Sequence, residues 1–103
     1  MLNEKILQKA KIITNGVNVK ITEPLKIHIH KRMNKVFERS KKLNNVEIEI
    51  KQENNITNSF EVTAILHIDK ENNIVQSVKN ESAYVAVNEL QNHILRKVNE
   101  LKN

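Results

Sequence analysis

Strict alternation between apolar and polar residues in two segments restricts the fold of this chain more than any other feature. In VEIEIKQ (46–52), Val46, Ile48 and Ile50 alternate with charged residues, and FEVTAILHI (60–68) continues the same period. A period of two predicts strands with one buried face. Such a sheet is stable only when a second layer covers its apolar face.

Two further segments complete the predicted sheet. NNIVQSVK (72–79) is a third strand, joined to the segment before it by the polar turn DKENN. IITNGVNVKI (12–21) is predicted as a strand that a bulge or bend interrupts around Asn15 and Gly16.

Helical periodicity appears in two places. Thr22 is a suitable N-cap, Glu23 suits the positive end of a helix, and Pro24 is accepted in a first turn. The first helix is expected to run from there to about Leu43, before Asn44. Its apolar stripe contains Leu25, Ile29, Met33, Val36, Phe37 and Leu43. The second helix is expected from about Asn80 to Leu101, with the stripe Ala83, Ala86, Val87, Leu90, Ile94, Val98 and Leu101.

The element order is therefore β-α-β-β-β-α. We expect an α+β fold of two layers, a four-stranded sheet with both helices on one face. The opposite face, which bears Glu47, Glu49, Glu61 and Thr63, is expected to meet solvent. The 103 residues are the length of one domain, predicted as an N-terminal extension (1–11) and a folded core (12–102).

Composition excludes several classes of function. The chain has no cysteine, which removes disulfides and thiolate chemistry, and its single glycine leaves no glycine-rich phosphate loop. No apolar run is long enough to span a membrane, and the N-terminus does not resemble a signal peptide. We expect a cytoplasmic protein.

Positive charge is concentrated in the first predicted helix. Residues 23–43 hold seven Lys or Arg and two Glu, whereas residues 44–81 hold three Lys and seven Asp or Glu. On a helical wheel, six basic residues share an arc of about 100°, centred about 120° from the apolar stripe. These residues are His28, Lys31, Arg32, Lys35, Arg39 and Lys42. A row of like charges indicates a partner that supplies a row of phosphates.

The basic row is also compatible with a partner other than nucleic acid, or with none. A solvated helix face or an acidic protein partner would accommodate it. A membrane surface is less suitable because the core needs the apolar stripe. The second helix adds His93, Arg96, Lys97 and Lys102, with Glu89 and Glu100 among them.

Catalytic and metal sites have little support. His28 and His30 lie about 200° apart on a helix, which disfavours a shared metal ion. Glu47 and Glu49 share a strand face but lack a pocket or a partner base. Tyr84 is expected at the edge of the core. Three aromatic residues in the whole chain argue against a sheet that stacks bases. We therefore expect no enzyme, no cofactor and no small-molecule substrate.

Three stretches resemble the ribosome hibernation-promoting factors and ribosome-associated inhibitors of bacteria and plastids. They are NGVNVKITEPLKIHIHKRMNKVF, VEIEIK and NESAYVAVNELQNHILRKV, and the resemblance covers about residues 12–102. It implies a β-α-β-β-β-α fold similar to double-stranded-RNA-binding domains. It also implies binding of rRNA in the small-subunit channel for mRNA and tRNA, which keeps idle ribosomes inactive.

The resemblance carries over to particular positions. Arg32 and Lys35 match basic positions of the family's first helix, Arg96 matches an arginine of its second, and His93 falls where lysine is common. Lys102 falls in the family's basic helix end. Asn88 and Asn92 depart from the family, which often has Asp there, and Glu100 and Leu101 interrupt a basic tail.

A C-terminal dimerisation domain is absent from the sequence, so we expect a short-form factor. The sequence leaves open whether it pairs ribosomes into dimers or occupies single ribosomes. The alternative function is a general double-stranded RNA-binding module.

Overall fold

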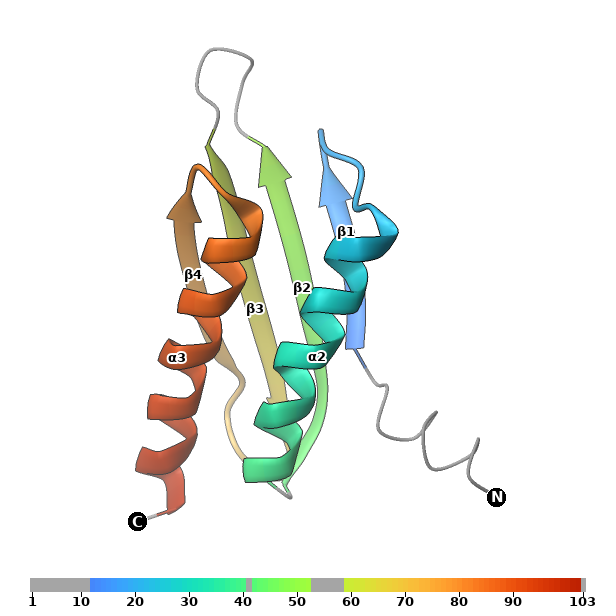
Figure 1. Ribbon diagram of the computed structural model, residues 1–103. Coiled ribbons are helices and arrows are strands. Elements are labelled where there is room, and N and C mark those ends of the chain that lie inside the picture. Colours follow the sequence, from blue (N-terminus) through green and yellow to red (C-terminus); the bar gives the residue numbers. More distant parts are fainter. Residues whose placement is uncertain (1–11, 41, 53–58, 103) are drawn as a thin grey trace, which may run out of the picture.

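The computed structural model describes residues 12–40, 42–52 and 59–102, and the predicted N-terminal extension lies outside these ranges. The element order confirms the predicted β-α-β-β-β-α sequence (Figure 1). The elements are β1 (Ile12–Val17), α2 (Glu23–Arg39), β2 (Leu43–Gln52), β3 (Phe60–Ile68), β4 (Ile74–Asn80) and α3 (Ala83–Lys102).

The described strands form one mixed sheet with the order β1-β2-β3-β4. β1 pairs with β2 in parallel, and the β2–β3 and β3–β4 pairs are antiparallel. Parallel neighbours need a long crossover, which α2 supplies. Both helices lie side by side on one face of the sheet, with α2 near β1 and α3 over β3 and β4 (Figure 1). The predicted two-layer α+β fold is confirmed.

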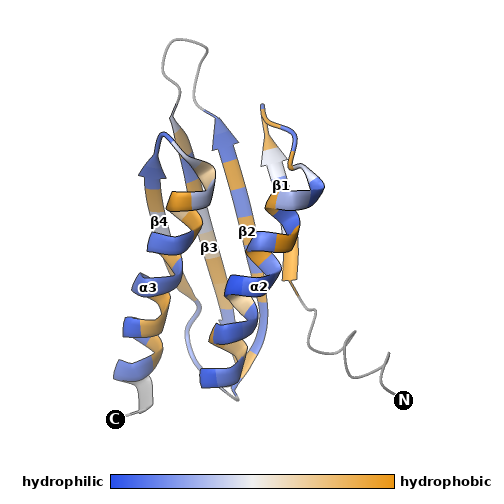
Figure 2. Cartoon of the chain, in the orientation of Figure 1, coloured by the Kyte–Doolittle hydropathy of each residue, from blue (hydrophilic) through white to orange (hydrophobic). Residues whose placement is uncertain are grey.

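A continuous apolar core fills the space between the two layers. α2 contributes Leu25, Ile29, Met33 and Val36. α3 contributes Ala83, Ala86, Val87, Leu90, Ile94 and Val98, and the sheet contributes Ile12, Leu43, Val46, Ile48, Ile50, Val62, Ala64, Leu66, Ile68 and Val78. Hydrophobic and hydrophilic residues alternate along β2 and along both helices, as this packing requires (Figure 2). The opposite sheet face is open to solvent, as expected.

Hydroxyl side chains cap the start of both helices. The Thr22 side chain accepts a hydrogen bond from the Leu25 N–H at 3.4 Å, which confirms the predicted N-cap. Ser82 accepts one from the Val85 N–H at 3.3 Å. Each bond satisfies a donor that the helix itself leaves unpaired.

The predicted end of the first helix is wrong. α2 ends at Arg39, and Ser40 has an extended backbone. Leu43 is buried but belongs to β2, where it pairs with Ile68. Leu43 follows Leu25 by about five helical turns, so its position on the wheel agreed with the stripe by coincidence. Strand pairing outweighs helical periodicity here, and Lys42 consequently lies in a turn outside the helix.

The predicted interruption of the first strand is also wrong. β1 passes through Asn15 and Gly16 in regular register with β2 and ends at Val17. The chain turns at Asn18, whose φ is 59°. After this turn the Val19 carbonyl lies so close to Gly16 that a Cβ there would overlap it. The glycine therefore permits a close approach of the backbone rather than a bulge.

The other strand limits differ little from expectation. The segment 60–68 is confirmed as β3. β2 begins at Leu43 instead of Val46, and β4 spans Ile74–Asn80 instead of 72–79. Pairing with β3 sets these ends, which side-chain alternation alone does not determine.

Two isoleucines of α2 provide a matched test of this packing. Ile29 is 0% exposed and Ile27 is 61% exposed. We expect Ile29→Ala to lower the free energy of unfolding by about 2–5 kcal/mol because it leaves a cavity between the layers. Ile27→Ala should change it by less than about 0.5 kcal/mol. Urea unfolding of both variants measures the difference, and equal losses would contradict the described orientation of α2.

Candidate nucleic-acid interface

The side of α2 that faces away from the sheet carries exposed positive charge. Lys31, Lys35 and Arg39 are exposed, and they follow one another at intervals of four residues. Within the described residues, these three side chains have no hydrogen bond or ion pair. Residues at this spacing are neighbours on a helix surface, so their charges form a row, and Glu38 is an exposed carboxylate beside it.

Two other predicted basic residues lie in the seam between α2 and α3. The Nε2 atom of His28 donates a hydrogen bond to Oδ1 of Asn88 at 2.8 Å. One turn later, Nη1 of Arg32 donates to Oε1 of Gln91 at 3.2 Å. The His28 ring also lies 5.1 Å from the Tyr84 ring, centroid to centroid, at an angle of 58°. His28 and Arg32 therefore join the two helices and border the row of exposed cations.

Tyr84 is 41% exposed, so it contributes to this seam more than to the core edge where it was expected. Its position beside His28 places an aromatic side chain at the start of the seam.

His93 and Lys97 of α3 lie on a different side of the helix layer from the exposed cations of α2. Asn88 and Gln91 mark the flank of α3 that faces α2. Glu89 marks the opposite flank, because its Oε1 accepts a hydrogen bond from Asn80 of β4 at 3.3 Å. His93 and Lys97 follow Glu89 by four and eight residues and share its flank. The structure therefore does not bring them together with the cations of α2.

The remaining predicted residues have separate positions. Arg96 and Lys97 are exposed, and Nζ of Lys97 lies 3.8 Å from Oε1 of Glu100. An exposed pair of this kind contributes little to stability. Lys42 is exposed in the turn before β2, where its carbonyl accepts the Asp69 N–H at 2.8 Å. Lys102 lies in α3, and its side chain is outside the described part of the structure.

The open face of the sheet has a different character. Glu47 contacts His67 across the β2–β3 pair at 2.5 Å, and the hydroxyls of Thr63 and Ser77 are 2.8 Å apart. Both side chains of the Glu47–His67 pair are partly exposed. These contacts connect neighbouring strands across the open face of the sheet.

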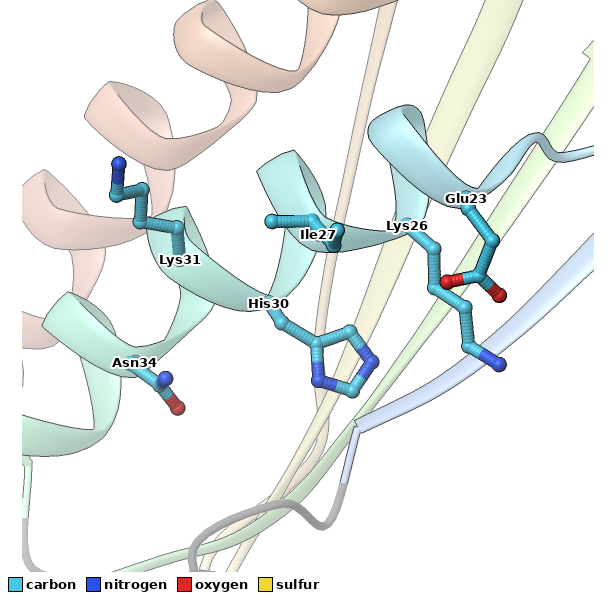
Figure 3. Close-up of a pocket in the computed structure, with 6 residues that line it drawn as sticks. All are labelled: Glu23, Lys26, Ile27, His30, Lys31 and Asn34. Carbon is cyan, nitrogen blue, oxygen red and sulfur yellow. The ribbon is translucent and has the colours of Figure 1, made fainter.

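A hollow of about 450 Å³ follows the first half of α2, away from the seam that His28 and Arg32 form with α3. Its lining residues are Glu23, Lys26, Ile27, His30, Lys31 and Asn34 (Figure 3). All of these come from one helix, so no second described element converges on a ligand there. His30 and Lys26 project to the same side of α2 in Figure 3. Burial, and secondarily the charge of Lys26, lower the pKa of His30 below 6.5.

Metal centres and membrane spans have strict geometric requirements. No three His, Cys, Asp or Glu side chains among the described residues are arranged to hold a metal ion. In the same part of the chain, no helix has the length and apolar composition needed to cross a membrane.

The interface residues predicted from the sequence do not include the two amide side chains that lie in the seam. Asn88 and Gln91 hold His28 and Arg32, yet neither carries a charge. A signal for Gln91 was present, because it falls within the apolar stripe of α3 between Val87 and Ile94. A polar residue at a buried position requires a hydrogen-bond partner, and that requirement points to the neighbouring helix.

The two-layer fold and the exposed cations of α2 define a small α+β protein suited to contact a polyanion. Similar folds occur among solved structures. A ribosomal subunit interface protein from Coxiella burnetii aligns with a TM-score of 0.78 and 18% identity, covering 88% of this chain and 96% of that one. The N-terminal domain of Protein Y from Thermus thermophilus aligns with a TM-score of 0.74 and 10% identity, covering 85% and 93%. At these identities the likeness establishes the fold alone.

The family follows from the sequence itself. Residues 12–103 match the family described as sigma 54 modulation protein / S30EA ribosomal protein. The chain belongs to this family, which confirms the family resemblance described from its sequence. A comparison with curated proteins finds no match.

His30 gives a prediction for the effect of pH on stability. Its lowered pKa means that the unfolded chain binds this proton more readily than the folded chain. The free energy of unfolding should therefore fall as the pH drops through 6.5 towards the lower pKa of the folded state. His30→Gln should make the loss of stability between about pH 7.5 and about pH 5.5 smaller. Urea unfolding at both pH values tests this, and an unchanged loss in the variant would contradict it.

Proposed function

We propose that this chain is a non-enzymatic factor of the cytoplasm that binds the small ribosomal subunit and keeps idle ribosomes inactive. Its membership of a family described as S30EA ribosomal protein carries the proposal. The family match spans residues 12–103, in line with a single ribosome-binding domain. The partner is rRNA in the channel that mRNA and tRNA occupy during translation, and occupation of that channel blocks initiation. The same experiments test whether the chain also pairs ribosomes into dimers or occupies single ribosomes.

The exposed cations of α2 supply the contact. Lys31, Lys35 and Arg39 present a row of positive charges to the RNA backbone, and Arg32 extends it into the seam. Phosphate contacts of this kind dominate affinity for nucleic acids and release counterions. The full proposed set of rRNA contacts is His28, Lys31, Arg32, Lys35, Arg39, Lys42, His93, Arg96, Lys97 and Lys102.

The α2 row can be tested by charge reversal. We expect Lys35→Glu with Arg39→Glu to abolish co-sedimentation with purified small subunits at moderate salt, because repulsion replaces two phosphate contacts. Both side chains are exposed, so the melting temperature should change little. The matched control is Lys20→Glu with Lys70→Glu, which makes the same change in net charge in loops outside the helices. Equal binding by the two double variants would refute the role of α2.

Competition with duplex RNA separates this function from a general double-stranded RNA-binding module. A ribosome-specific factor is retained on small subunits when free duplex RNA is present at equal phosphate concentration. Displacement by duplex RNA would instead identify the α2 row as a generic RNA-binding surface. Gradients of whole ribosomes from the same experiment show whether dimers form.

A further inference from the structure

Gln91 occupies an unusual position for an amide. It is 4% exposed and is the single polar side chain that is buried within the described residues. Its neighbours along the buried stripe of α3 are the core residues Val87 and Ile94. Burial of an amide is unfavourable unless hydrogen bonds replace those to water. An apolar residue would fill the same place without this penalty, so the polar group calls for a specific role.

The partner of Gln91 suggests that role. Its Oε1 accepts a hydrogen bond from Nη1 of Arg32, which belongs to the proposed RNA interface. A guanidinium group has five N–H donors, so this bond leaves others for a second acceptor. An arginine held in place loses less conformational freedom when it binds a phosphate than a freely moving one. The buried end of the contact thus fixes the direction of a half-exposed cation.

The acceptor of this hydrogen bond, the side-chain amide of Gln91, carries no charge. A carboxylate in place of Gln91 would hold Arg32 more tightly, but it would also compensate the positive charge that phosphate requires. His28, one turn earlier in α2, is likewise held by the neutral amide of Asn88. The described contacts of the seam therefore orient both side chains without adding negative charge.

We propose that Gln91 is a positioning residue of the RNA interface, which aligns Arg32 across the helix seam and leaves its charge available to an RNA phosphate. This inference rests on the proposed function. It assigns to α3 a part in RNA binding that is separate from that of its own basic residues, because Gln91 acts through Arg32 of α2.

The decisive variant is Gln91→Glu, which keeps the size and the hydrogen bond and adds a charge. Arg32 pairs with the new carboxylate and offsets the cost of burying its charge, so we expect the variant to stay folded, while its affinity for purified small ribosomal subunits falls roughly tenfold. The slope of log affinity against log salt should decrease in magnitude by about one, as for the loss of one phosphate contact. Asn92→Asp is the matched control, because it adds the same charge at the next, exposed residue of α3. An equal effect of both variants would overturn the proposal.

A second variant and a double-mutant cycle test the route through Arg32. Gln91→Met keeps the packing but removes the acceptor, and it should weaken binding without a change in the salt slope. In an Arg32→Ala background, Gln91→Glu should have no further effect on affinity. Normal affinity of Gln91→Met, or a full effect of Gln91→Glu without Arg32, would overturn the positioning role.

The outcomes also separate this inference from the proposed function. A wild-type chain that fails to bind small subunits overturns both. Binding that depends on Lys35 and Arg39 but is unaffected by Gln91→Glu overturns the role of Gln91 alone.

Discussion

The apolar face of the sheet is the constraint on which the rest of the structure depends. Strands β2 and β3 turn a row of aliphatic side chains to one side, and this surface is stable only when it is covered. Two amphipathic helices cover it, each through one stripe. Once Ile29, Met33 and Val36 point into the core, the direction of every other residue of α2 follows. The row of Lys31, Lys35 and Arg39 faces away from the sheet for this reason.

The seam between the helices adds a second, more selective constraint. Apolar contacts hold the helices on the sheet but tolerate small rotations, whereas hydrogen bonds require a particular alignment. The pairs His28–Asn88 and Arg32–Gln91 supply that alignment, each contributing about 0.5–1.5 kcal/mol. Arg32 consequently belongs to the packing and to the charged surface at once. Lys35 and Arg39 belong to the surface alone, so their charge can be altered with little effect on the fold.

Most of the fold could be predicted because alternation and helical periodicity report which face of an element is buried. These patterns indicated the order of the elements, the limits of β3 and the one-sided placement of the helices. The same patterns did not predict where some helices and strands end, because pairing between strands determines those limits. Leu43 satisfied the helical stripe yet joins β2, and Gly16 suggested a bulge yet permits the close approach of Val19. The basic residues of α2 were evident from sequence, but the amide of Gln91 gained meaning only when α3 was placed beside α2.

The separation of the cations on α3 from those on α2 bears on the kind of RNA that fits. Lys31, Lys35 and Arg39 face outward from α2, whereas His93 and Lys97 lie on the flank of α3 that faces β4. Packed helices have axes about 8–10 Å apart, so one phosphate backbone that follows α2 does not reach that flank. Engagement of both sets requires phosphates on more than one side of the helix layer. Under the proposed function, RNA that forms the walls of a channel would offer this arrangement, whereas a single phosphate backbone laid along α2 would not.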